Sequence, residues 1–211
     1  MKKILLICVI VMSIASNCFA AKIERDATVA VMDFGVHTGA VPFDISAFNA
    51  GKIAHEYILQ QLLESNKFTI MDKYVVEEKI QAENLNTTGL IDQDTARRIG
   101  EMLGVKYIIY GNVNDVTLSD VGTKVAFAGV TVCTVQSHII ARIMNVETGD
   151  IIAMSKGEGK CKSSYVKAKG GPVMLLEIGT KKVSQDSVHN ALEKAATQTV
   201  DILVERLYNA Q

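Results

Sequence analysis

The sequence predicts an α/β protein built as a single mixed β-sheet with helices packed on it and a long C-terminal helix. Two observations carry this prediction. In the first half of the chain, β-branched apolar runs alternate with stretches in which apolar residues recur at helical spacing. In the second half, apolar runs follow one another with only short turns between them. This arrangement is typical of one sheet with helices packed on its faces, and the chain shows no internal repeat and no second domain.

The first half predicts three strands and three helices. Residues 28–34 (TVAVMDF) read as a buried strand, 67–72 as a short strand and 105–113 (VKYIIYGNV) as a third. A helix is expected over 50–65, with Ile53, Tyr57, Ile58 and Leu62 on one face. Two more helices are expected over 72–83, capped by Asp72, and over 92–104, capped by Asp92 or Asp94 and ended by Gly104.

The second half predicts further strands and the final helix. Residues 121–135, with Gly129 near the middle, suggest a strand pair, and 136–144 with 150–159 form a β-hairpin. We expect the core to span about residues 28–160, a variable loop about 160–184, and a helix about 185–208. The helix is marked by apolar spacing at Val188, Leu192, Ala195, Thr199, Leu203 and Leu207.

The hairpin sets the positions of two cysteines. If Glu147–Gly149 is a three-residue turn with Gly149 in a left-handed bulge, Val146 faces Asp150. Counting outward, Cys161 then faces Val135 and Cys133 lies diagonal to it. Diagonal positions are roughly 7–8 Å apart, beyond the usual reach of a disulfide. The register therefore favours two unpaired thiols.

The N-terminus reads as a signal peptide over residues 1–20. Lys2 and Lys3 precede an apolar run of eleven residues, Ile4–Ile14, which is too short for a bilayer span of roughly 20 residues. Small residues at Cys18 and Ala20 favour cleavage after Ala20, so that Ala21 begins a mature domain of residues 21–211. The alternative is a lipoprotein that begins at Cys18, although Asn17 suits that cut poorly.

The sequence contains none of the familiar catalytic or cofactor patterns. The HEYIL run at His55 lacks the second histidine of a zinc helix, and neither a phosphate-binding loop nor a nucleophile elbow occurs. We expect His55 to lie on a helix surface and Asp33 to be a structural carboxylate. With 22 basic and 23 acidic residues and no basic stripe, nucleic acid is not an expected partner. We therefore expect no enzyme, cofactor or metal site.

Four segments stand in an order that resembles the CsgG family, the curli-production assembly/transport components. They are VAVMDF from residue 29, SNKFTIMDK from 65, TARRIGEMLGVKYIIYGNV from 95 and ARIMNVETGDII from 141. The resemblance covers most of residues 28–160. The positions that match the family pattern are Asp33, Phe34, Gly104, Gly111, Thr148 and Gly149.

The resemblance implies a CsgG-like fold and a non-enzymatic role. It indicates an exported, periplasmic-domain-like protein that self-associates, contacts other envelope proteins and assists assembly or transport of surface material. We expect it in the periplasm, with outer-membrane association left open and integral insertion not expected. Family members include outer-membrane export channels for curli-like subunits and periplasmic activators of cell-wall synthases, and both roles stay as alternatives.

The channel alternative depends on two segments, about Val116–Ser137 and Gly157–Asp186, that would have to cross the membrane as strand pairs. The second segment carries six lysines, at 160, 162, 167, 169, 181 and 182, and a Gly-Gly-Pro break. A lysine on a lipid-facing strand costs about 2–4 kcal/mol at mid-membrane. This composition favours an aqueous segment over a membrane-spanning one.

The N-terminal pattern gives a first testable prediction. When the full chain is expressed in a Gram-negative host, mass spectrometry of the mature protein should find Ala21 as the first residue. A mature chain that starts at a diacylglycerol-modified Cys18 would contradict the prediction.

Overall fold

The computed structural model describes residues 27–37, 49–83, 91–125, 128–168 and 185–208. The predicted signal peptide and cleavage site, Ala20 and Ala21, lie outside these residues. The described elements run in chain order as β1 Thr28–Val31, β2 Gly35–Val36, α3 Ala50–Ser65, β3 Thr69–Ile70, α4 Lys73–Ala82, α5 Gln93–Leu103, β4 Tyr107–Val125, β5 Ala128–Asn145, β6 Ile151–Ala168 and α6 Gln185–Tyr208.

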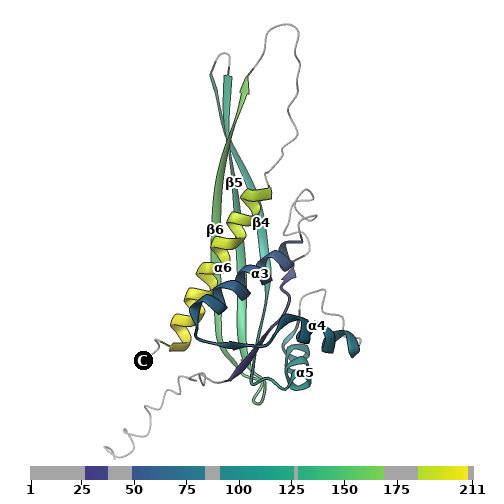
Figure 1. The fold of residues 1–211 in the computed structure, drawn as a ribbon. Coiled ribbons are helices and arrows are strands. Elements are labelled where there is room, and N and C mark those ends of the chain that lie inside the picture. Colours follow the sequence, from purple (N-terminus) through teal and green to yellow (C-terminus); the bar gives the residue numbers. More distant parts are fainter. Residues whose placement is uncertain (1–26, 38–48, 84–90, 126–127, 169–184, 209–211) are drawn as a thin grey trace, which may run out of the picture.

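The strands form one mixed sheet, as the sequence predicts. Its order is β3-β1-β4-β5-β6, and β2 pairs with β4. β1 pairs in parallel with β3 and with β4, and β2 pairs in parallel with β4. The long strands β4, β5 and β6 form an antiparallel ribbon. Figure 1 shows this ribbon as long, twisted strands that extend past the N-terminal end of α6.

The three ribbon strands are longer than the sequence predicts. They contain 19, 18 and 18 residues, whereas a strand in a globular protein usually has about 3–10. The expected strand pair at 121–135 is the far end of the β4–β5 hairpin. The expected variable loop does not begin at about residue 160, because β6 continues to Ala168, and the rest of the expected loop, residues 169–184, lies outside the described residues. The inner face of β6 carries small residues, so its apolar alternation is too weak to reveal the strand.

Helices cover the two faces of the sheet and enclose two separate cores. On one face, α3 and α6 lie side by side and pack on residues such as Ile109, Ile139 and Ile143. On the other face, α4 and α5 cover only the end of the sheet around Ile108 and Met144. The rest of that second face, along β5 and β6, carries no helix among the described residues (Figure 1).

The helix termini follow the predicted caps. The Asp72 side chain accepts hydrogen bonds from two backbone N–H groups at the start of α4. Asp92, rather than Asp94, caps α5 by accepting from the Thr95 N–H at 2.7 Å. Gly104 ends α5 in the left-handed conformation, with φ of 69°, where a residue with a Cβ would be strained.

Two glycines bring α6 unusually close to β6. A Cβ on Gly157 would lie 2.1 Å from the Ala195 carbonyl oxygen, and one on Gly159 would lie 1.8 Å from that of Ala191. Real atoms do not approach this closely, so the helix backbone rests directly on the strand backbone. The contact fixes the distance between the sheet and its longest described helix.

Next to the β5–β6 turn, the strand pairing is shifted by one residue from the predicted register, and further along the strands it agrees with the prediction. The N–H of Asn145 donates to the Asp150 carbonyl, so Asn145 and not Val146 closes the turn. A bulge next to Ile143 restores the predicted pairing, and Val135 faces Cys161 as expected. Gly149 has the predicted left-handed φ, at 78°. Cys161 is a free thiol, whereas the side chain of Cys133 lies outside the described residues.

The backbone contact predicts a large effect of one methyl group. We expect Gly159→Ala to lower the free energy of unfolding by about 3 kcal/mol, because the methyl overpacks the α6–β6 contact. Gly104→Ala serves as the comparison, since its methyl group would contact no neighbouring atom. That substitution should lower the free energy of unfolding only by the cost of the left-handed backbone conformation, about 1–2 kcal/mol. Urea unfolding of residues 21–211 measures both, and a Gly159→Ala change within 0.5 kcal/mol of zero would contradict the packing described.

Candidate interaction surfaces

Asp33 and His55 meet where the chain leaves β1. Asp33 is half-exposed, and its Oδ1 lies 3.6 Å from Nδ1 of His55. His55 is buried, with 2% of its surface exposed, and its Nδ1 lies 3.0 Å from the Met32 carbonyl oxygen. The expectation of a surface histidine is therefore wrong. Gly51 and Ala54 are small and buried, so α3 can lie close to the sheet. The side of the helix that carries His55 therefore faces the interior.

Phe34 and Gly111, two positions of the family pattern, lie in contact. A Cβ on Gly111 would lie 2.6 Å from Cε1 of Phe34 and 2.1 Å from the Ile140 carbonyl oxygen. Because Gly111 on β4 has no side chain, the buried Phe34 ring can pack against the sheet at this position. The pair joins the segment after β1 to the middle of the sheet, which is a structural role.

Thr148 and Gly149 form the β5–β6 turn, and α5 holds that turn in place. The Thr148 hydroxyl accepts from the Asp150 N–H at 3.2 Å. Gln93, in the first turn of α5, donates to the Gly149 carbonyl at 2.8 Å, and Arg97 donates to the Glu147 carbonyl at 3.4 Å. The family-pattern residues thus lie at the end of β1, at the Phe34–Gly111 contact, at the end of α5 and in the β5–β6 turn, and they do not converge on one site.

Within the described ranges, no group of three or more His, Cys, Asp or Glu side chains is placed to hold a metal ion. None of the described helices combines the length and the apolar character needed to cross a membrane. In the described part of the molecule, two faces are exposed: the surface of α3 and α6, and the side of β4, β5 and β6 that carries no helix along β5 and β6.

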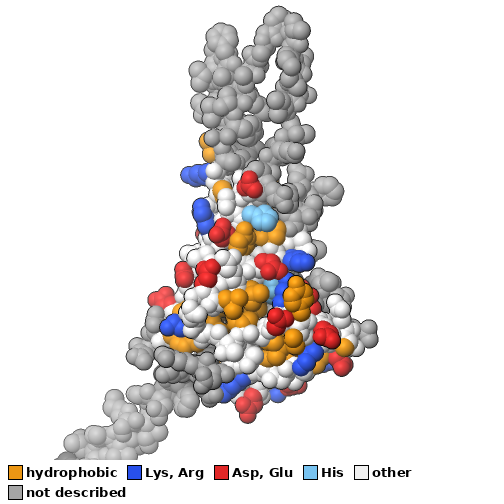
Figure 2. All heavy atoms as spheres, in the orientation of Figure 1, with side chains coloured by type: hydrophobic (Ala, Val, Ile, Leu, Met, Phe, Trp, Pro, Cys, Tyr) orange, Lys and Arg blue, Asp and Glu red, His pale blue; other side chains and the backbone are white. Residues whose placement is uncertain are grey.

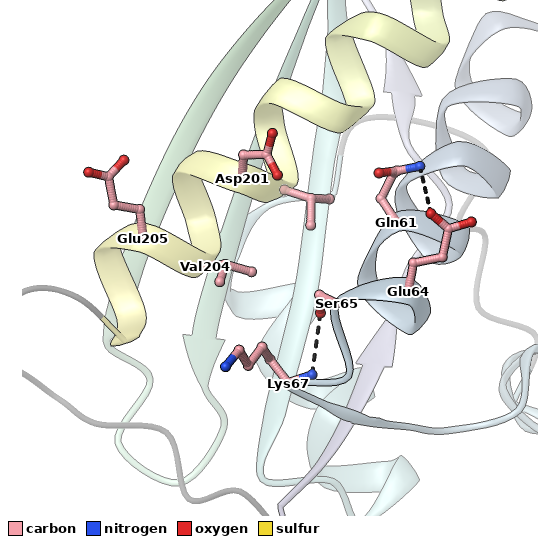
Figure 3. A pocket seen from close by; sticks show the side chains of 8 residues that line it. Gln61, Glu64, Ser65, Lys67, Asp201, Val204 and Glu205 are labelled. Atoms are coloured by element: carbon pink, nitrogen blue, oxygen red, sulfur yellow. Dashed lines mark hydrogen bonds between the residues drawn. The ribbon is translucent and has the colours of Figure 1, made fainter.

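The first face is the surface of α3 and α6. The two helices are joined at one end by Tyr57 and His189, whose rings pack edge to face at 6.3 Å. At the other end, Tyr208 packs on Phe68 and donates to the Lys67 carbonyl at 2.7 Å. Between these joints lies a groove of about 400 Å³ lined by Gln61, Glu64, Ser65, Lys67, Val200, Asp201, Val204 and Glu205 (Figure 3).

This face, which we name the helical face, is acidic. Glu64, Glu193, Asp201 and Glu205 are exposed on it, and Lys67 is the basic residue of the groove. The helices also carry the exposed basic residues Lys52, Lys194 and Arg206, of which the last two donate to backbone carbonyls of β6. The pKa of Tyr57 is raised, first by burial and then by the charge of Glu193. Figure 2 shows hydrophobic side chains with both acidic and basic ones around them on this side of the molecule.

The second face is the uncovered side of β4, β5 and β6, which we name the sheet face. His138 on β5 links all three strands, because its Nδ1 contacts Asp115 on β4 and its Nε2 lies 3.7 Å from Glu158 on β6. The ammonium of Lys160 lies 2.6 Å from Glu158. Lys160, followed by His138, holds the pKa of Glu158 below its usual value.

A second groove, of about 420 Å³, lies where the sheet face meets α5. Its polar lining includes Tyr110, Asn112 and Arg142 from the sheet and Asp92 from the helix cap. Burial raises the pKa of Tyr110, and the nearby Arg142 opposes that effect. Sequence reasoning missed this groove and the His138 cluster, because neither shows a motif and both depend on strand register.

Comparison with known proteins gives one family. The model of the family described as curli production assembly/transport component CsgG matches residues 14–211. No match is found among curated proteins.

Several solved structures are similar at low identity. The C-terminal domain of LpoB from Salmonella enterica has 18% identity and a TM-score of 0.45, covering 71% of this chain and 90% of that one. The lipoprotein GNA1162 from Neisseria meningitidis has 15% identity and a TM-score of 0.44, with coverage of 65% and 84%. A PelC dodecamer from Paraburkholderia phytofirmans has 13% identity and a TM-score of 0.41, with coverage of 88% and 92%.

The ion pair beside Asp33 gives a prediction about pH. Lys73 donates to Glu56 and holds the pKa of Glu56 below its usual value of 4.5. A lowered pKa in the folded state means that the pair stabilises the protein above about pH 4.5, and that this contribution is lost as the pH falls through the folded pKa.

We therefore expect Glu56→Gln to destabilise the protein at pH 7 by less than about 1 kcal/mol, because Glu56 is half-exposed. The difference from wild type should shrink below pH 4.5. Urea unfolding at pH 7 and pH 3.5 measures it, with the exposed Glu78→Gln as control. A difference that persists unchanged at pH 3.5 would exclude the ion pair as its source.

Proposed function

Because the chain belongs to the CsgG family, we propose that it is an exported, non-enzymatic protein of the cell envelope. It assists the assembly or transport of surface material through protein–protein contacts, and it associates with copies of itself. We place it in the periplasm after cleavage behind Ala20. The domain that acts there is residues 21–211.

The observation that carries this proposal is the family match along residues 14–211. The surfaces of the molecule support it. In the described part of the molecule, the helical face and the sheet face are both exposed, both follow the part of the ribbon that lies beside α6, and they carry different charge. Extended faces of this kind suit contact with another protein better than capture of a small ligand, which usually needs a deeper, mostly enclosed pocket.

An outer-membrane export channel is the second candidate, and one observation favours it. The strands β4, β5 and β6 continue through residues 116–125, 128–137 and 157–168. These are the segments that a channel would require to be extended. The lysines of the second segment still argue against this role.

The proposal predicts where the protein is found and in what form. Residues 21–211 should be recovered from the periplasmic fraction without detergent. Multi-angle light scattering of the purified protein should show a mass several times 20 kDa at about 10 µM, a concentration at which specific interfaces of standard size are occupied.

Two results would overturn it. Recovery only from detergent-solubilised outer membrane, with ion conductance in a planar bilayer, would favour the channel. A monomer at every concentration up to about 100 µM would remove the self-association.

A further inference from the structure

We propose that the groove between α5 and the sheet face, which we name the α5 groove, binds the C-terminal carboxylate of a peptide whose last side chain is apolar. Arg142 and Tyr110 hold the carboxylate, and the isoleucines of the groove contact the last side chain. The site adds a partner of defined chemistry to the protein–protein contacts proposed above, and it does not depend on self-association.

Two buried side chains present unused polar groups to the α5 groove. Tyr110 is 3% exposed and Asn112 is 8% exposed, and both line the groove. Neither the Tyr110 hydroxyl nor the Asn112 amide has a hydrogen bond to another described residue. Polar groups of buried side chains in proteins are usually paired. The two groups are therefore available to a ligand that enters the groove.

Arg142 supplies the fixed positive charge of the α5 groove. It lies directly opposite Tyr110 in the pairing of β4 and β5, so the two side chains share one face of the sheet. Arg142 forms no salt bridge with a described residue. A planar guanidinium can bind a carboxylate through two parallel hydrogen bonds, and the Tyr110 hydroxyl can donate another. One fixed charge matches a singly charged carboxylate better than a doubly charged phosphate.

Asp92, the acidic residue of the described lining, is already used by the cap of α5. Its carboxylate accepts from the Thr95 N–H at 2.7 Å, and this bond lowers its pKa. The partial positive charge of the helix N-terminus offsets it further. An arriving carboxylate therefore meets Arg142 as the uncompensated charge, whereas the ammonium of a free amino acid has no unused carboxylate to bind. This difference favours the end of a peptide over a free amino acid.

The rest of the α5 groove suits an apolar side chain with a peptide attached. Ile91, Ile140 and Ile151 line it, and Ile151 is 40% exposed. The volume of about 420 Å³ falls within the roughly 300–1,000 Å³ of ligand sites. The groove is continuous with the sheet face, along which no described helix lies over β5 and β6 (Figure 1). The preceding residues of a bound peptide can leave along this face, and capture of a chain end is one of the recurring modes of peptide recognition.

Fluorescence anisotropy with labelled peptides tests the site. A panel of short Gly/Ser peptides carries an N-terminal fluorescein and ends in Ala, Val, Leu, Met or Phe with a free carboxylate. A second panel is identical except for a C-terminal amide. With residues 21–211, we expect the best free-acid peptide to bind with a Kd below about 100 µM. Its amide should bind at least about tenfold more weakly, because the charge-assisted hydrogen bonds are lost.

Variants assign the carboxylate to its partners. Arg142→Gln should remove the preference for the free acid, so that acid and amide bind equally weakly. Tyr110→Phe should weaken the free acid about threefold to tenfold and leave the amide unchanged. Arg98→Gln makes the same substitution at an exposed position of α5 outside the groove lining and should keep the wild-type preference. The urea midpoints of Arg142→Gln and Tyr110→Phe should match the wild type, since neither side chain has a hydrogen bond to a described residue.

Several results would overturn the assignment. A preference for the free acid that persists at about tenfold in Arg142→Gln would place the carboxylate elsewhere. The site is also wrong if no free-acid peptide binds with a Kd below about 1 mM. Displacement of the peptide by free leucine as readily as by N-acetyl-leucine would exclude a peptide end, and equal displacement by inorganic phosphate would indicate a general anion site. None of these results affects the periplasmic recovery or the mass from light scattering, so the proposed function stands or fails separately.

Discussion

The contact between α6 and the β6 backbone at Gly157 and Gly159 is the constraint on which the rest of the structure depends. Side chains usually separate a helix from a sheet, but here the carbonyls of Ala191 and Ala195 approach positions that a Cβ would occupy. The close approach buries Leu192, Ala196 and Leu203 against the sheet.

The same contact protects an exposed strand edge. β6 is an edge strand of the sheet, and unpaired strand edges invite uncontrolled pairing with other chains. One row of α6 meets this edge: Arg206 donates to the Met154 carbonyl, Gln198 accepts from the Glu158 N–H at 2.6 Å, and Lys194 donates to the Lys160 carbonyl at 3.2 Å. Along the length of α6, association through the edge is therefore disfavoured, and the two open faces become the surfaces that another copy can reach.

The sequence was sufficient for the order of elements and insufficient for several side-chain environments. The α6 helix, the caps at Asp72 and Asp92 and the register of Cys161 with Val135 follow from local spacing and turn chemistry. The burial of His55 does not, because it depends on how closely α3 approaches the sheet. The length of β6 was also missed, since its inner face reads Ser155, Gly157, Gly159 and not a row of large apolar residues.

The surfaces were still harder to predict. The helical face draws its acids from α3 and α6, more than a hundred residues apart in the chain, and the His138 cluster joins three strands through their register. No spacing rule links such positions. The family-pattern residues, by contrast, lie at a strand end, a helix cap, a turn and a close contact within the fold.

The most direct test of the account is to identify what lies against Asp201 in the cell. A photo-activated cross-linking amino acid at position 201 of one tagged copy, in cells that co-express a second copy with a different tag, distinguishes contacts within a copy from contacts between copies. The account predicts cross-linked products that carry both tags, in which position 201 of one copy is joined to a second copy. Cross-links only to other proteins, or only within single copies, would contradict it.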